Sequence, residues 1–136
     1  MLDYSSLVKA ISQLEKALNF AKSTDPKNNA ELFEQFRNSV IQTFEYSYEL
    51  CFKLIRRKLM ENAPTIDEIA SLSFQDVIRE GARVGIIDDP EAWFDYRTVR
   101  NKTSHAYQEP FAIEAFNMAQ KFLPDAKKIL AHLKTN

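Results

Sequence analysis

An arginine, a histidine and a tyrosine fall within one short polar stretch, at Arg100, His105 and Tyr107 of "RNKTSHAYQEP". A histidine titrates near neutral pH, so it can take a proton from a ribose 2′-hydroxyl or give one to a leaving oxygen. An arginine stays charged and can bind a phosphate through two parallel hydrogen bonds, including the charge that builds as phosphorus becomes pentavalent. Together the two side chains would suffice for RNA cleavage without a metal or other cofactor, with the ribose 2′-oxygen as the nucleophile.

This chemistry requires a helix to end between the arginine and the histidine. Residues five apart on an unbroken helix are separated by about 140°, so Arg100 and His105 would face different ways. The intervening "NKTS" is a poor helix former, and Asn101 or Ser104 can end the helix. We therefore expect Arg100 on a last helical turn, with His105 and Tyr107 close to it in the turn that follows. The alternative is that the histidine only has a structural role in a polar turn. One histidine cannot easily be both acid and base, so a second copy from a symmetry mate would help.

Other charged residues lie on a long apolar segment upstream. Glu45 and Glu49 are four residues apart, hence on one face of a helix. They are either solvated surface or carboxylates that hold something basic, such as a partner or the arginine of a site. The run Arg56-Arg57-Lys58 lies near the end of the same segment, where the helix macrodipole alone accounts for it. Contact with a phosphate is the alternative for this run.

Length, charge and composition narrow the class of protein. The chain of 136 residues fits one domain, and its formal net charge of -1 gives no bulk attraction to nucleic acid or an anionic membrane. We expect no DNA or membrane partner, and any RNA or nucleotide contact must come from a local patch. The first residues interleave Lys and Glu with apolar residues, which predicts a cytoplasmic protein without a signal peptide. The single cysteine, Cys51, excludes an intramolecular disulfide, and two distant histidines predict no zinc site.

Apolar periodicity predicts long helices. One stripe runs from Leu7 to Ala21 in steps of three and four residues. A second lies in residues 27–63, a stretch without Gly or Pro, and predicts a spine of roughly 30 helical residues. Its stripe comprises Phe33, Phe36, Val40, Phe44, Tyr48, Cys51, Ile55 and Leu59, widened by Ile41, Phe52 and Leu54.

Capping signals divide the next segment into shorter helices. Thr65 with Glu68 fits a capping box, and Ser73 with Asp76 resembles one. Gly85 fits a helix C-cap.

Two further helix starts frame the polar stretch. Asp89 followed by Pro90 predicts a helix whose core contacts are Trp93, Tyr96 and Val99. A last helix is expected to open at Pro110 and to kink or restart at Pro124. Its expected stripe is Phe116, Ala119, Leu123, Ala126, Leu130 and Leu133. These patterns predict an all-α fold, a single domain over residues 1–136 built as an antiparallel up-and-down bundle of about five helices.

The run from Arg100 to Tyr107 matches the R-x4-H-x-Y motif of the HEPN superfamily (higher eukaryotes and prokaryotes nucleotide-binding domains), in which an asparagine such as Asn101 most often follows the arginine. More narrowly, the chain resembles the small bacterial nucleotidyltransferase substrate-binding proteins, also known as the HepT toxins. The likeness extends over nearly the whole length and includes "FEYSYELCFKLIRRKL" and "REGARVGIIDDPEAW".

The resemblance implies a homodimer whose two motifs face a shared cleft, and a minimal nucleotidyltransferase as partner. In such toxin–antitoxin pairs the HEPN member resembles an RNase toxin, and the nucleotidyltransferase inhibits it by adding AMP to the motif tyrosine. Carried onto this chain, Arg100 and His105 would be catalytic and Tyr107 would accept AMP. The candidate supporting residues are Asn101, Glu45 and Glu49.

Two other hypotheses stay open. The older family name implies a non-catalytic subunit that holds a nucleotide or another substrate for the nucleotidyltransferase. In a purely structural dimer, the three motif residues would only stabilise the turn, and Tyr107 would be buried.

Overall fold

The computed structural model describes residues 2–63 and 66–135, and all regular structure within them is helical. The elements are α1 (Ser5–Lys22), α2 (Ala30–Asn62), α3 (Ile66–Ala70), α4 (Phe74–Arg83), α5 (Pro90–Arg100), the 3-10 turn η1 (Thr103–His105) and α6 (Glu109–Thr135). The expected all-α bundle is confirmed. The described residues hold six α-helices rather than about five, because α3 forms one short helix more.

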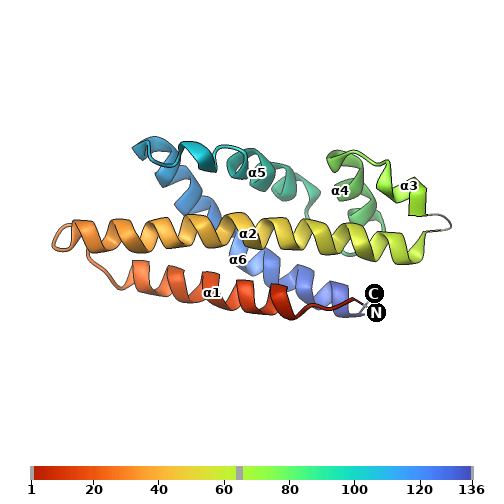
Figure 1. Ribbon diagram of the computed structural model, residues 1–136, viewed down its shortest axis with the longest axis horizontal. Coiled ribbons are helices and arrows are strands. Elements are labelled where there is room, and N and C mark those ends of the chain that lie inside the picture. The colour runs from red at the N-terminus through yellow and green to blue at the C-terminus, as the bar shows by residue number, and fades with distance from the viewer. Residues whose placement is uncertain (1, 64–65, 136) are drawn as a thin grey trace.

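The long helix α2 is the spine of the bundle (Figure 1). It contacts every other α-helix, with α1 along one side and α3, α4 and α5 along the other, while α6 crosses it diagonally. In Figure 1, α1 and α5 run in one direction and α2 and α6 in the other, so the bundle is antiparallel and up-and-down. The first and last helices also meet near their ends, where the Tyr4 hydroxyl donates to the Leu133 carbonyl at 3.0 Å.

The expected apolar stripes bring these helices together. Every apolar position of the α1 stripe from Leu7 to Ala21 is buried, and so are the central positions of the α2 stripe from Val40 to Leu59. The rings of Phe33, Phe36 and Phe52 are only partly buried at the margin of the core. Cys51 is a free thiol in the core, as expected for a small apolar residue in this position.

An aromatic cluster fixes the place of α5 against α2 and α6. Trp93 of α5 stacks on Tyr48 of α2 at a centroid distance of 5.7 Å. Tyr96 of α5 meets Phe122 of α6 edge-on at 5.2 Å, and Phe122 meets Phe44 of α2 in the same way at 5.2 Å. All five rings are buried, and edge-to-face pairs add to the free energy gained by burial alone. The cluster therefore fixes the direction in which α5 ends, and so the position of the residues that follow it.

The capping signals act largely as expected. The Ser73 hydroxyl accepts a hydrogen bond from the Asp76 amide at 3.2 Å and caps α4. Past the end of α4, Gly85 adopts φ +87°, and the Ile86 amide donates back to the Gly81 carbonyl at 2.9 Å. This is the left-handed helix ending that glycine permits.

The other predicted cap and helix start lie on either side of α4. The capping box expected from Thr65 and Glu68 includes Thr65, which lies outside the described residues. Asp89 caps α5 through a bond from the Ala92 amide at 3.2 Å, and Pro90 occupies the first helical turn.

The last helix continues through its internal proline. The helix α6 is a single element from Glu109 to Thr135, so it does not restart at Pro124. A proline inside a helix costs about 3 kcal/mol, but buried side chains on both sides of it hold α6 in register. They include Phe122, Ala126 and Ile129.

The buried stripe of α6 also differs from the expected one. Three of the six expected positions are buried: Ala119, Ala126 and Leu133. The other three, Phe116, Leu123 and Leu130, are only partly buried, and the core takes the residue before each of them, Ala115, Phe122 and Ile129. A helix of 3.6 residues per turn presents both rows as near neighbours, and α6 packs against α1, α2 and α5, so its buried face is wider than one row. Among residues 2–63 and 66–135, every helix is too short or too polar to traverse a lipid bilayer.

Candidate functional site

The helix α5 ends at Arg100, so the helix end separates this arginine from His105, as expected from the sequence. Asn101 is the C-cap, and its amide donates to the Arg97 carbonyl at 2.9 Å. The chain then turns through η1, where the His105 amide donates to the Lys102 carbonyl at 2.9 Å. The motif therefore lies in a short connection held by its own backbone between α5 and α6.

Arg100 faces two carboxylates of α2. Its Nε atom lies 2.5 Å from Glu49 Oε1, and its Nη2 atom lies 3.8 Å from Glu45 Oε1. From the sequence, Glu45 and Glu49 could be either solvated surface or the partners of a basic group. The structure places them against this arginine. The helical spacing of four residues gives the guanidinium one carboxylate per turn of α2.

Thr103 links this ion pair to the turn. Its hydroxyl lies 3.0 Å from Glu45 Oε2 and 2.7 Å from the Arg100 carbonyl oxygen. A hydroxyl carries one proton, so it donates to one of these acceptors at a time. Thr103 therefore ties the start of η1 either to the end of α5 or to α2.

His105 and Tyr107 are exposed in the turn that follows α5. The imidazole ring lies 5.8 Å from the ring of Phe111 and 6.5 Å from that of Tyr107, measured between centroids. Tyr107 is 81% exposed, and its hydroxyl accepts a hydrogen bond from the Gln108 amide group at 3.2 Å. The structural hypothesis expects a buried Tyr107, whereas this side chain is exposed in the single chain.

The motif residues thus divide into two neighbouring groups. Arg100 contacts the α2 carboxylates, whereas the His105 ring lies beside that of Phe111 in the first turn of α6. Among the described residues, no hydrogen bond or ion pair joins Arg100 to His105. Their action on one phosphodiester remains a prediction.

A groove of about 450 Å³ runs between α2 and the turn, and Tyr107 lines it. On the α2 side its wall includes Arg37 and Glu45. The Arg37 guanidinium, only 11% exposed, binds both carboxylate oxygens of Glu109 at 2.6 and 3.0 Å. This contact lowers the pKa of Glu109. It also fixes the first turn of α6 onto α2, directly after the motif.

Sequence reasoning missed Arg37, Thr103 and Glu109. A signal for Arg37 was present, because it precedes Glu45 by eight residues, two steps of four, and so lies on the same row of α2. No comparable signal identified Glu109, because its role depends on how α6 packs on α2. The basic run at Arg56 contacts an aromatic ring instead of a carboxylate, with the Arg56 guanidinium 5.2 Å from the centroid of Phe52.

Comparison with known proteins agrees with this architecture. Residues 2–135 match the family described as "Nucleotidyltransferase substrate binding protein like". A Haemophilus influenzae protein named "Probable ribonuclease HepT" is 37% identical over 94 residues, which cover 69% of this chain and 64% of that protein. Just under two thirds of that relative's length is therefore matched.

Two solved structures share the fold. HI0074 from Haemophilus influenzae, described as the substrate binding domain of a nucleotidyltransferase, has a TM-score of 0.87 at 29% identity and covers 97% of this chain and 99% of its own. A crystal structure of a Thermus thermophilus protein has a TM-score of 0.73 at 24% identity and covers 93% of this chain and 98% of its own.

Proposed function

Because this chain belongs to the family of nucleotidyltransferase substrate-binding-like proteins, we propose that it is the HEPN-type member of a two-component toxin–antitoxin pair. In this proposal it is a metal-independent endoribonuclease, and its partner, a minimal nucleotidyltransferase, inhibits it by adding AMP to Tyr107. The observation that carries the proposal is the accessible turn, with an arginine held at one end and an exposed histidine and tyrosine at the other. The named ribonuclease relative supports the same reaction class.

The proposed cleavage uses the ribose 2′-oxygen as nucleophile. His105 takes the 2′-hydroxyl proton, the 2′-oxygen forms a bond to phosphorus, and the bond from phosphorus to the 5′-oxygen breaks. The products are a 2′,3′-cyclic phosphate and a 5′-hydroxyl, whose proton comes from a second histidine. We propose that this second histidine is His105 of a symmetry mate in a homodimer, because one imidazole cannot easily serve as acid and base in the same step.

Arg100 is proposed to hold the phosphate. Glu49 faces the Nε edge of the guanidinium, which leaves the Nη groups to donate to non-bridging oxygens of the phosphodiester. Such donors stabilise the negative charge that grows on phosphorus oxygens in the transition state. Glu49, Glu45 and Thr103 would then act as positioning residues, and Asn101 would support the same helix end.

The proposed inhibition is a transfer of AMP from ATP. The Tyr107 hydroxyl oxygen forms a bond to the α-phosphorus, the bond to the β-phosphate oxygen breaks, and pyrophosphate leaves. The tyrosine proton passes to a base of the nucleotidyltransferase. The exposure of Tyr107 supports this step, since a second protein must reach its hydroxyl. A phosphate on Tyr107 would repel an RNA phosphate from the adjacent histidine and arginine.

Cleavage in EDTA tests the proposal. The purified protein is expected to cut single-stranded RNA in EDTA and leave 2′,3′-cyclic phosphate ends, and His105→Ala is expected to abolish the cut. Equal cleavage by His105→Ala and the parent protein would remove His105 from the mechanism. Coexpression with the partner nucleotidyltransferase is expected to add mass in multiples of AMP, and Tyr107→Phe is expected to prevent the addition.

A second candidate is a non-catalytic subunit that binds a nucleotide or another substrate for the nucleotidyltransferase. The groove of about 450 Å³ beside Tyr107 favours it, because its volume fits a small ligand, and HI0074 is described as a substrate binding domain. It predicts nucleotide binding in calorimetry and no RNA cleavage at any protein concentration. Growth arrest on expression, relieved by His105→Ala, would count against it.

A further inference from the structure

A second groove, of about 360 Å³, lies between α4 and α5, and Asn101 is the lining residue that it shares with the motif. Phe74, Phe94, Arg97 and Asn101 are among its lining residues. Its volume is within the range of small-ligand sites, roughly 300 to 1,000 Å³. Among the described residues, no acidic side chain lines it. The groove beside Tyr107, by contrast, is lined by three glutamates.

Each phenylalanine ring of this groove is paired with an arginine, Arg97 of its lining or Arg79 outside the lining, which also pairs with Asp76. The Arg97 guanidinium lies over Phe74 at 4.0 Å from the ring centroid, and that of Arg79 lies over Phe94 at 5.7 Å. The Phe74 and Phe94 rings meet edge-on at 6.4 Å. Both rings are only partly buried, so the pairs form a surface of flat, cationic and aromatic groups.

Such a surface suits a single-stranded nucleic acid. Bases stack on aromatic rings and on guanidinium planes, and they do so with little dependence on sequence. A guanidinium also attracts the phosphate of the same nucleotide. No carboxylate among the described residues pairs with Arg97, so its charge is available to an anionic ligand.

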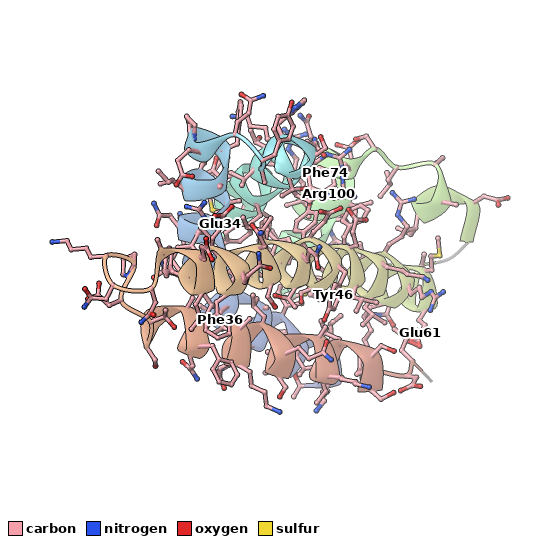
Figure 2. All side chains as sticks on the ribbon, turned by 60° about the vertical axis from the view of Figure 1, so that its left-hand side comes forward. Glu34, Phe36, Tyr46, Glu61, Phe74 and Arg100 are labelled. Carbon is pink, nitrogen blue, oxygen red and sulfur yellow. The ribbon has the colours of Figure 1, made fainter. Side chains whose placement is uncertain are left out.

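The groove is continuous with the motif. Arg97 and Asn101 line the groove about one helical turn apart, and Arg100, the residue before Asn101, lies about 5 Å from Arg97 along the helix axis. Figure 2 shows Phe74 and Arg100 on the same side of α2, away from α1. A strand whose phosphodiester reaches Arg100 would therefore extend its next nucleotide over Arg97 and Phe74.

We propose that the groove between α4 and α5 is a subsite for one nucleotide of single-stranded RNA, next to the phosphodiester bound at Arg100. This inference rests on the proposed function and adds to it the place where the RNA beside the cleaved bond is held. Arg97 stacks on the base and attracts its phosphate, Phe74 supports the guanidinium from below, and Phe94 packs edge-on against Phe74.

The test measures RNA binding apart from cleavage. Full-length protein carrying His105→Ala, which keeps the RNA intact, is titrated against a fluorescein-labelled single-stranded 12-nucleotide RNA in EDTA, with anisotropy as the readout. Adding Arg97→Gln is expected to weaken binding about tenfold and to flatten the dependence of log affinity on log salt, since one phosphate contact is lost. Arg97→Lys keeps the charge but not the flat stacking surface, so it is expected to preserve the salt dependence and still weaken binding severalfold.

Arg83→Gln is the matched control. Arg83 is an exposed arginine of α4 paired with Glu80, nine residues and about 13 Å of helix away from Phe74, and its loss is expected to leave RNA affinity unchanged. Thermal melting checks that each variant is folded.

Each result bears on a different part of the proposal. RNA binding that is equally tight with Arg97→Gln overturns the subsite, even if the parent protein cleaves RNA. RNA binding that depends on Arg97, in a protein that never cleaves RNA, supports the subsite and overturns the nuclease. Loss of nucleotidyltransferase binding with unchanged RNA affinity would identify the groove as a protein-docking surface and overturn the subsite.

Discussion

Glu49→Ala is expected to slow RNA cleavage strongly while leaving the fold almost as stable. In the native protein Glu49 Oε1 lies 2.5 Å from Arg100 Nε, and a second carboxylate beside this guanidinium, from Glu45, lies 3.8 Å away. Without Glu49 the arginine keeps the longer contact and gains rotational freedom. A displacement of about 1 Å in a catalytic group can cost a factor of about 100. We therefore expect kcat to fall by about ten- to a hundredfold, which corresponds to roughly 1.4 to 2.7 kcal/mol in the activation barrier.

The expected loss of stability is much smaller. The side chains of Arg100 and Glu49 are 32% and 51% exposed, and water screens such a pair so that it contributes about 0.2 to 1 kcal/mol. Thermal melting should therefore shift by only a few degrees at most. The assay is single-turnover cleavage of a labelled RNA in EDTA, with urea unfolding of the same preparations.

Two further variants make the result specific. Glu15→Ala breaks another exposed ion pair, between α1 and Lys127 of α6, and is expected to cost similar stability without changing kcat. Glu49→Gln keeps an oxygen beside Arg100 Nε and is expected to recover most of the turnover. Unchanged kcat in Glu49→Ala, or an equal loss in Glu15→Ala, would refute the idea that Glu49 positions the arginine.

Three other predictions concern the scaffold. Phe122→Ala removes the ring that Phe44, Trp93 and Tyr96 share, and should lower the free energy of unfolding in urea by about 3 to 5 kcal/mol; a loss under about 1 kcal/mol would contradict the account of the aromatic cluster. Gly85→Ala places a side chain at φ +87° and should cost about 1 to 2 kcal/mol, visible as a lower melting temperature, whereas unchanged melting would mean that the turn relaxes. Arg37 lowers the pKa of Glu109, so their contact stabilises the fold above the ordinary carboxylate pKa, and this stabilisation is lost as the pH falls through the lowered value. Glu109→Gln should therefore lower the urea midpoint at about pH 7, and by progressively less as the pH falls through the acid range; an effect that does not change with pH would exclude the charge as the cause.

Much of the bundle can be predicted from the apolar periodicity and the helix-capping and helix-breaking residues of the sequence. The run without Gly or Pro predicts α2, and the Asp89-Pro90 pair predicts the start of α5, because each depends on a few local residues. The helix α6 does not restart at Pro124, and three of its six expected core positions are replaced by the residue before each of them. Both depend on contacts with other helices, which outweigh local preference once α6 packs against the rest of the core.

In the candidate site, too, local features could be predicted from the sequence and long-range contacts could not. The end of α5 after Arg100 is a local property of "NKTS", and the sequence predicts it. The pairing of Arg100 with Glu49 joins residues 51 positions apart, so spacing offers α2 carboxylates as candidates without selecting their partner. Thr103 and Glu109 acquire their roles only after η1 and α6 are placed on α2.

The ion pair between Arg100 and the α2 carboxylates links the helical scaffold to the proposed chemistry. A fully buried ion pair would hold the guanidinium firmly, but a phosphate could then bind only by leaving a carboxylate charge buried without a partner. The pair with Glu49 is half exposed, so water can solvate the carboxylate when an RNA phosphate draws the Nη groups away. A half-exposed contact of this kind orients the arginine, and little free energy is needed to separate the guanidinium from Glu49. The same helix that forms the core would thus keep the motif arginine ready to bind RNA, because its carboxylates lie at the margin of the core.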